Sequence, residues 1–278
     1  MRKRQFKTQT DVDRAFKNGY GQGELESYKP WIRAQDIGSK GESHKIRSNK
    51  TNRVHHCLSK LEAAYLLVLD FSEDVVDIRE QFPLFASQNT FDLAAELGIA
   101  YPYFPQTTVP YVMTTDFLVT VRGPGGETRF AARTLKYASD LSDEKNLRLL
   151  EKFELERAIW QSRGVDDWKI VTEKTIGKNL TNNMIWLRRG ADETNAPAMA
   201  GLADAFLAGL ERFRHPDRKL DSTIRTVTKM LDLDYSAGIL LFKRLMWEKK
   251  IRIDLHGHKL SSACLCPDMV IDLPKMAA

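Results

Sequence analysis

Two strand-like runs around a short glycine-rich connection constrain the fold of this chain more than any other feature. They lie in "MTTDFLVTVRGPGGETRFAARTLKYASDL", residues 113–141, where β-branched and aromatic residues flank "GPGG". Side chains alternate along a strand, so Thr134 and Lys136 share one face of the second run. A connection of odd length, such as residues 124–126, places Asp116 directly opposite Thr134. The segment therefore predicts a β-hairpin that brings an aspartate and a lysine to one spot.

This hairpin has two interpretations: a solvated hairpin with ordinary surface charges, or half of a metal-dependent nuclease site. A divalent metal held by carboxylates can hydrolyse a phosphodiester if another group positions the water and offsets the developing charge. Asp116 and Lys136 then require one more acid. The first candidate is Glu62 in "LSKLEAAYLLV", which also fits a helix capping box with Ser59, and the second is Glu80 in "DIREQFPL".

The order of patterned segments predicts two domains. A chain of 278 residues is long for a single hydrophobic core. Up to residue 173, strand-like and helical patterns mix as in an α/β domain with helices on the faces of a mixed sheet. We expect helices at 11–18, 59–71 and 143–164, and strands at 45–48, 53–58, 75–83 and 166–174, besides the hairpin. We therefore predict domains at 1–173 and 174–278.

The second domain is predicted to be mostly helical and to end in a winged helix-turn-helix. Helical patterns cover 176–190, 195–213, 221–231 and 236–250, and "DLDY" separates the last two. Two strand-like segments follow in "IRIDLHGHKLSSACLC". The expected recognition helix, 236–250, is mainly apolar and offers few side chains that could read base edges. Docking to a protein is therefore at least as good an interpretation as sequence-specific DNA binding.

Positive charge is concentrated near the N-terminus. Up to Lys60 there are 14 lysine and arginine residues against 6 acidic ones, and the remainder has 28 against 31. A cationic strip of this kind can neutralise phosphates, although an ordinary soluble surface explains it too. The residues that we expect to contact DNA from this strip are Lys45, Arg47, Lys50, Arg53 and His55.

Cysteine and hydropathy patterns point to a reducing compartment and away from a membrane. The three cysteines are odd in number, and Cys57 lies far from Cys264 and Cys266. We expect no secretory signal, because the basic start lacks an apolar run, and no membrane role. His256 and His258 with the two late cysteines could suggest zinc, but H-x-H followed by C-x-C fits no usual zinc pattern.

An ordered set of motifs resembles TnsA, the endonuclease subunit of heteromeric cut-and-paste transposases. The set is "HHCLSKLEAAYLLVLDFSEDVVDIREQFPL", "MTTDFLV", "FAARTLKYASDL" and "LEKFELERAIWQ", and weaker similarity extends over nearly the whole chain. The resemblance implies a restriction-endonuclease-like catalytic domain. It also implies a prokaryotic, cytoplasmic and nucleoid-associated protein. Its expected partners are double-stranded DNA at transposon ends, the recombinase TnsB, and the ATPase TnsC through the C-terminal domain.

The resemblance also assigns roles to residues. Glu62 and Asp116 would ligate Mg²⁺, for which Mn²⁺ is expected to substitute, and Lys136 would orient the water or stabilise the pentavalent phosphate. By the same analogy Arg79 and Gln81, the neighbours of Glu80 in the sequence, would contact DNA. The alternative is a role in a salt bridge.

The chain departs from the family at one position. Two residues before the lysine, where an acid or a glutamine is expected, it carries Thr134, whose hydroxyl is a weaker ligand. Either the Leu135 backbone carbonyl carries more of the coordination, or only one metal is held firmly. One apparent extra residue in "FAARTLK" leaves open whether Arg133 or Thr134 occupies this place. In "EKFELER", Glu151, Glu154 and Glu156 are interpreted as the solvated side of a helix, with support of Lys136 as the alternative.

The leading hypothesis is a Mg²⁺-dependent endonuclease that hydrolyses one strand at each 5′ end of a transposon while a partner cuts the 3′ ends. A non-catalytic DNA-binding or scaffold subunit with a degenerate site is the alternative, and Thr134 keeps it open. A third hypothesis is a nuclease that acts without partners.

Overall fold

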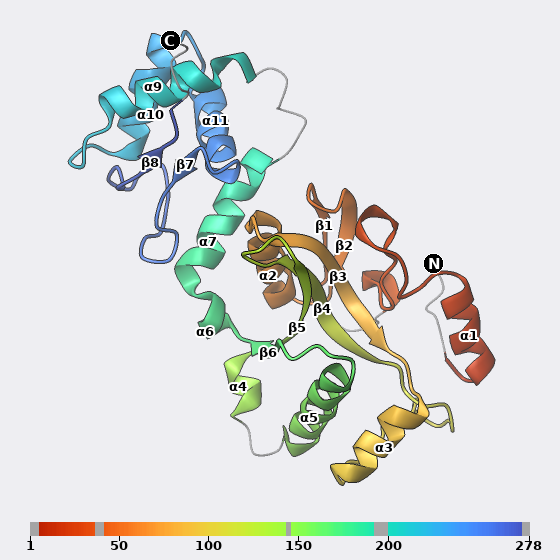
Figure 1. Cartoon of the computed structure of the whole chain (residues 1–278). Helices are drawn as coiled ribbons and strands as arrows, with labels where there is room; N and C mark the ends of the chain where they lie inside the picture. The colour runs from red at the N-terminus through yellow and green to blue at the C-terminus, as the bar shows by residue number, and fades with distance from the viewer. Residues whose placement is uncertain (1–5, 37–41, 143–145, 192–199, 274–278) are drawn as a thin grey trace. The chain divides into compact units, whose positions relative to one another are not determined.

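The chain divides into two compact units, Met1–Ile176 and Gly177–Ala278. The computed structural model describes residues 6–36, 42–142, 146–191 and 200–273 (Figure 1). We describe each unit by itself. Within these described ranges, none of the helices combines the length and the apolar character that crossing a membrane requires.

The N-terminal unit is built from one four-stranded sheet, one separate hairpin and helices that cover the sheet. Its strands are β1 (His44–Ser48), β2 (Arg53–Cys57), β3 (Val75–Leu84), β4 (Met113–Arg122), β5 (Thr128–Leu135) and β6 (Trp168–Val171). Its helices are α1 (Gln9–Lys17), α2 (Lys60–Phe71), α3 (Gln88–Glu96), α4 (Ala138–Leu141), α5 (Leu147–Ser162) and α6 (Glu173–Ile176), with single 3₁₀ turns η1 (Leu25–Ser27) and η2 (Ala34–Asp36).

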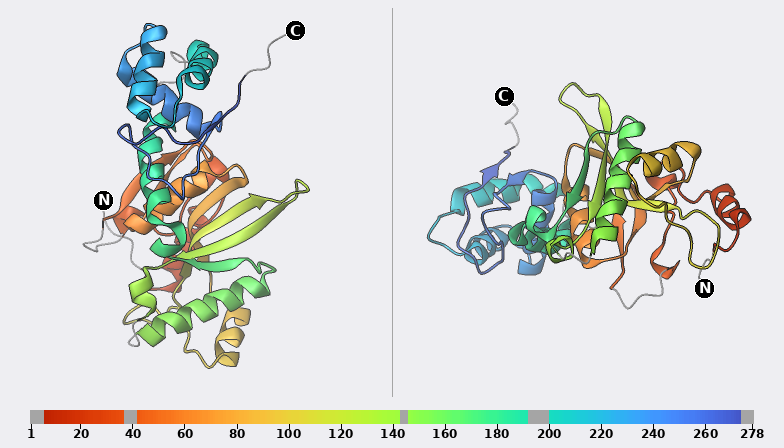
Figure 2. Two further views of the ribbon diagram at one scale, coloured as in Figure 1. Left: turned by 90° about the vertical axis from the view of Figure 1, so that its left-hand side faces the viewer. Right: turned by 90° about the horizontal axis from the view of Figure 1, so that it is seen from below.

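The sheet is mixed, as predicted. Its strand order is β3-β4-β5-β6; β4 is antiparallel to both β3 and β5, and β6 runs parallel to β5. Phe117 pairs with Arg133 across the predicted hairpin, which puts the next residue of each strand, Asp116 and Thr134, opposite one another. The predicted register is therefore confirmed. Gly126, with φ of +88°, makes the turn, and the tip of the hairpin projects beyond the rest of the sheet (Figure 2).

Helices cover both faces of this sheet. On one face, Tyr65 of α2 packs edge-on against Phe117 of β4, with ring centroids 5.9 Å apart. On the other face, α5 and α3 enclose a hydrophobic core cluster, in which Leu118 and Ala132 meet Ile159 (Figure 1). Burial of these apolar side chains on both sides fixes the sheet between two helical layers.

The C-terminal unit is mostly helical. It contains α7 (Lys178–Leu187), η4 (Arg188–Ala191), η6 (Ala200–Leu202), α9 (Ala203–Phe213), α10 (Leu220–Met230), α11 (Tyr235–Trp247), β7 (Ile251–Arg252) and β8 (Val270–Ile271). Phe206, Leu210, Ile224 and Phe242 are fully buried and form its core. The helices α10 and α11 and the pair β7–β8 are the elements that a winged helix-turn-helix would use, and that classification stays a prediction.

The predicted second strand after His258 is wrong. The Asp254 carboxylate accepts the backbone N–H groups of His256 and Gly257, which makes a tight turn, and the Asn183 side chain holds the carbonyls of Leu255 and His258. These side-chain contacts shape the turn, and residues 262–266 then form backbone hydrogen bonds with residues 218–221, around an isolated bridge between Lys219 and Leu265, rather than with β7. The partner of β7 is instead β8, further along the chain.

The helix α11 is largely covered by its own unit. Lys243 is buried, with its ammonium 4.3 Å from the centre of the Trp186 ring. A Cβ on Gly190 would lie 2.5 Å from the backbone nitrogen of Arg244, so η4 lies directly against the helix. Only Ser236, Glu248 and Lys250 are exposed within 236–250. This helix has few side chains to present to a DNA groove.

Candidate active site

The alternation of side chains along β3 reverses at Gln81. Glu80 contacts Arg53 and His55 of β2, whereas Phe82, two residues further on, packs with its ring centroid 5.7 Å from that of Trp160 in α5. Residues two apart in a regular strand share a face, so the strand must turn over between them. Gln81 has φ of +48°, a left-handed conformation that costs a non-glycine residue on the order of 1–3 kcal/mol. Backbone strain of this kind often marks functional sites.

Asp116 lies on β4 opposite this turn. The pairs Glu80–Phe117 and Phe82–Thr115 flank it in the register of β3 and β4. Its Oδ2 accepts the backbone N–H of Leu135 (2.7 Å), and its Oδ1 accepts the Gln81 side-chain amide (3.1 Å). Burial raises the pKa of Asp116, while the Leu135 and Gln81 hydrogen bonds and the Lys136 charge act in the opposite direction.

Glu62 lies in the first turn of α2 and faces Asp116. The Ser59 hydroxyl accepts the backbone N–H of Glu62 (3.1 Å) and donates to its carboxylate (2.9 Å), as expected of an N-cap. The predicted capping box is wrong in one detail, because the carboxylate reaches back to the amide of Leu58 (2.8 Å). Burial, followed by the neighbouring Asp116, raises the pKa of Glu62 to about 8. Its capping contact and its place near Asp116 coexist.

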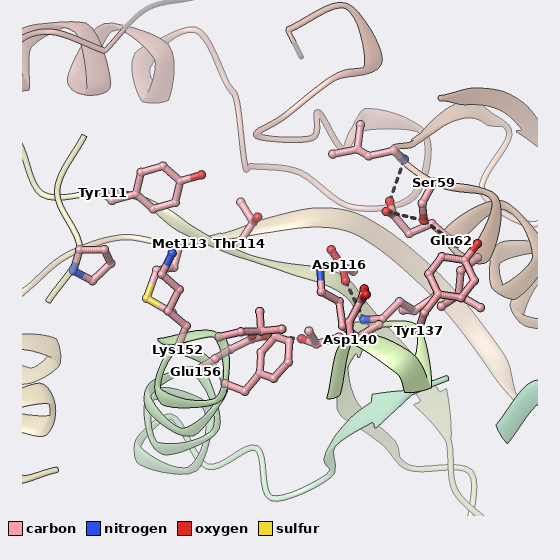
Figure 3. A pocket seen from close by; sticks show the side chains of 18 residues that line it. Ser59, Glu62, Tyr111, Met113, Thr114, Asp116, Tyr137, Asp140, Lys152 and Glu156 are labelled. Atoms are coloured by element: carbon pink, nitrogen blue, oxygen red, sulfur yellow. Dashed lines mark hydrogen bonds between the residues drawn. The ribbon is translucent and has the colours of Figure 1, made fainter. Parts of the chain in front are cut away.

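These acids line one cavity of about 470 Å³ in the N-terminal unit (Figure 3). The other predicted site residues, Thr134, Leu135 and Lys136, line it as well. Lys136 directly follows β5, and its backbone N–H donates to the Val171 carbonyl (3.0 Å). The hydrogen bond to β6 therefore fixes the backbone of the lysine. Arg133 points elsewhere and pairs with Asp167 (3.0 Å), so Thr134 is the residue at the site.

Glu156 lies in the cavity, and its predicted place on the solvated side of the helix is wrong. It is buried in α5 rather than solvated, and it also lines the cavity. The hydroxyls of Thr134 and Thr115 both donate to its Oε1 at 2.6 Å, and burial raises its pKa to about 7. The available signal was its spacing: Glu156 lies three residues after Phe153 and four before Trp160, on the apolar stripe of the helix.

The residues predicted to contact DNA fall into two groups. Lys45 and Arg47 are exposed on the β1–β2 hairpin. Lys50 is half-buried and donates to the Ser72 carbonyl at the end of α2 (2.9 Å). Arg79 is 6% exposed, and its Nε lies 3.3 Å from Asp77 Oδ2. This ion pair is the predicted alternative to a DNA contact for Arg79. Gln81 is buried between the two acids.

Glu80, the second acid candidate, forms a buried charge network away from the cavity. Arg53 donates to both of its carboxylate oxygens (2.9 and 2.5 Å), and the His55 Nδ1 lies 2.8 Å from Oε2. Burial alone would raise the pKa of Glu80, but His55 and Arg53 hold it well below its usual range. Arg53 and His55 are themselves buried. Their predicted DNA contacts do not fit this arrangement, because Glu80 already engages both side chains.

The donor set suits a hard cation that retains water. In the described part of the chain, no three histidine, cysteine, aspartate or glutamate side chains are arranged to hold a metal ion, and this includes the late histidines and cysteines. The cavity offers two adjacent carboxylates, a hydroxyl and strand backbone. Mg²⁺ is commonly held by one or two carboxylates with several waters, so the residues fit this ion.

Comparisons with known proteins agree with the motifs. Residues 72–173 match the family model "TnsA-like endonuclease N terminal", and residues 175–255 match "TnsA endonuclease C terminal". The chain is 40% identical over 229 residues to the transposon Tn7 transposition protein TnsA of Escherichia coli, covering 82% of this chain and 78% of that protein. The chain therefore belongs to the TnsA endonuclease family.

Proposed function

We propose that this protein is a Mg²⁺-dependent DNA endonuclease that cuts one strand at the 5′ ends of a transposon, together with a recombinase partner that cuts the 3′ ends. The observation that carries the proposal is the meeting of Glu62, Asp116 and Lys136 in one cavity. Membership of an endonuclease family supports the reaction type.

The two carboxylates and the ammonium group have different proposed roles. Glu62 and Asp116 would hold the ion, with Asp116 central because the Leu135 N–H fixes one of its oxygens. A bound Mg²⁺ would activate a water and offset charge on the phosphate. Lys136 would orient that water or stabilise the phosphate as negative charge develops.

Thr134 and Glu156 together would replace the acid that the strand lacks. The Thr134 hydroxyl donates a hydrogen bond to Glu156 (2.6 Å). The lone pairs of its oxygen therefore remain available to a ligand in the cavity. This contact would orient the hydroxyl as a ligand, as outer hydrogen bonds do at metal sites. The Leu135 carbonyl remains the other proposed ligand.

The binding roles are divided between the units. Lys45 and Arg47 are exposed and would contact DNA phosphates without reading sequence. Because α11 is covered by its own unit, it has few side chains that could read bases, and the proposed partner of the C-terminal winged helix is a protein, the ATPase TnsC. Choice of cleavage site would then come mainly from TnsC and the recombinase TnsB.

The decisive test is cleavage of transposon-end DNA by the assembled transposase with Mg²⁺, with cuts mapped on both strands. Asp116→Ala and Lys136→Ala should each abolish the 5′ cuts and leave the 3′ cuts in place. Lys169→Ala, which removes an exposed lysine of β6, serves as the matched control.

The same assay separates the alternatives. Unchanged 5′ cutting by both site variants would reject the nuclease and favour a DNA-binding scaffold. Equal cutting by the wild-type chain with and without the recombinase would indicate a nuclease that acts alone.

A further inference from the structure

We infer that Gln81 is a positioning residue that holds Glu62 and Asp116 together as a preformed divalent-ion site. The inference rests on the nuclease function proposed above. It replaces the predicted DNA contact of Gln81 with a role in holding the two acids. Gln81 is only 2% exposed, so it lies within the protein rather than on a DNA-binding surface.

The Gln81 side chain joins the two acids. Its Nε2 donates to Asp116 Oδ1 at 3.1 Å and lies 3.4 Å from Glu62 Oε2. Its Oε1 accepts the hydroxyl of Thr114 (3.2 Å), which leaves the NH₂ group for the carboxylates. In the deprotonated state that binds a metal ion, the carboxylates only accept hydrogen bonds, so this orientation of the amide is the one that satisfies all three partners.

The backbone places this amide where a regular strand could not. Because φ of Gln81 is +48°, β3 turns over at this residue. The N-terminal segment holds the turn: the Trp31 N–H donates to the Gln81 carbonyl (3.3 Å), and the Tyr28 hydroxyl donates to the Glu80 carbonyl (3.1 Å). Both aromatic side chains are buried. The strained conformation is thus supported from outside the sheet, as expected when it serves a site.

A neutral amide is suited to this task. Two adjacent carboxylates repel one another, and a shared donor reduces the tendency of either side chain to turn away. A lysine or arginine at this position would neutralise the pair and compete with a cation, whereas glutamine leaves the negative charge in place. Each contact, at 3.1 and 3.4 Å, uses one of the several lone pairs of a carboxylate, so the others remain available to an ion while the amide stays in place.

Metal binding by the full chain tests the inference without relying on activity. We would titrate Mn²⁺ and Mg²⁺ calorimetrically into wild type, Gln81→Met and Asp116→Asn. Gln81→Met keeps the size of the side chain but removes the amide, and it should raise the Kd about 10–100-fold, as loss of an outer-shell partner typically does. Thr114→Val, which removes only the group that orients the amide, should have a smaller effect in the same direction.

Two controls separate positioning from general structural damage. Ile78→Val trims a buried side chain of the same strand without touching the acids, and it should leave the Kd unchanged. Cleavage by Gln81→Met should recover at high Mg²⁺, whereas cleavage by Asp116→Asn should not.

The outcomes are distinct. If Asp116→Asn loses metal binding but Gln81→Met binds as tightly as wild type, the positioning role is rejected. Tighter binding by Gln81→Met would also reject it, because the amide would then compete with the ion. If wild type binds neither metal, both the proposed function and this inference are rejected.

Discussion

In the proposed function, Thr134 and Glu156 together compensate for the acid that the strand lacks. The hydroxyl of Thr134 occupies the strand position where an acid is expected, and the carboxylate behind it comes from α5. We predict that Thr134→Val lowers Mg²⁺ affinity and cleavage about tenfold, because the cavity loses an oriented oxygen. It should also reduce the free energy of unfolding by about 1–3 kcal/mol, since buried Glu156 loses a donor.

Thr115→Val is the matched control for this prediction. The Thr115 hydroxyl donates to the same Glu156 oxygen and accepts from the Trp160 indole (2.7 Å), but Thr115 does not line the cavity. Urea denaturation should show a stability loss at least as large as that of Thr134→Val. Metal affinity should stay close to wild type; an equal fall in both variants would mean that the effect is structural.

Local pattern predicted that Asp116 and Thr134 lie opposite one another, and the family resemblance singled out Glu62, Asp116 and Lys136. The surroundings of Glu156 and Gln81 depend on tertiary contacts and were not predicted. Strand alternation and an odd connection were enough to put Asp116 opposite Thr134. Nothing local distinguished Glu156 from its neighbours Glu151 and Glu154 except its place on the apolar stripe. The left-handed turn at Gln81 could not be read from the sequence, because glutamine has no preference for it and Trp31 supplies the support from 50 residues away.

At the scale of elements, the Glu80 network ties the β1–β2 hairpin to the sheet. Arg53 and His55 come from β2, and Glu80 from β3, with all three side chains buried. We predict that Glu80→Gln reduces the free energy of unfolding by about 3–5 kcal/mol, because Arg53 is left buried without a counter-ion. Chemical denaturation measures this, and a loss below 1 kcal/mol would show that the network is dispensable.

The exposed side of the same hairpin carries two of the residues predicted to contact DNA, Lys45 and Arg47. We expect Lys45→Glu and Arg47→Glu to weaken DNA binding across unrelated sequences, and each to lower the slope of log affinity against log salt by about 1. Binding measured at several salt concentrations tests this. Lys169→Glu, at the exposed β6 position, provides a control of equal charge change, and an equal effect there would indicate nonspecific electrostatics rather than a contact.

The predicted secondary structure agrees with the structure where a hydrophobic pattern extends over many residues. It is wrong where side chains form hydrogen bonds with the backbone. Most helices and sheet strands lie close to their predicted bounds, because period and burial agree there. The strand predicted at 166–174 is shorter, since α6 begins at Glu173. Residues 143–145 and 195–199 of two predicted helices lie outside the described residues. After β7 the chain instead follows hydrogen bonds from Asp254 and Asn183, which lie 71 residues apart in the sequence. Apolar α11 illustrates the same limit, since its pattern indicated a helix but not that η4 covers it.

At the scale of the whole molecule, the site should make stability depend on pH. Burial raises the pKa of Glu62 to about 8 and of Glu156 to about 7, against an ordinary value of 4.5, and it raises the pKa of Asp116 as well. Between about pH 5 and pH 8 the folded chain therefore retains protons that the unfolded chain has released. Stability must then fall as the pH rises through this window.

We predict that the metal-free protein loses about 1 kcal/mol or more of stability from pH 5.5 to 8.5, seen as a fall of at least about 2–4 °C in Tm. The variant Glu62→Gln with Glu156→Gln should lose most of this dependence. Bound Mg²⁺ should oppose the fall, because the ion requires the deprotonated carboxylates and stabilises the folded state by about 2.7 kcal/mol at 100 times its Kd. A Tm that rises with pH without metal would contradict the burial of these acids. A Mg²⁺ effect that is equal at pH 5.5 and 8.5 would mean that the ion binds elsewhere, because only a site made of these carboxylates must release their protons to fill.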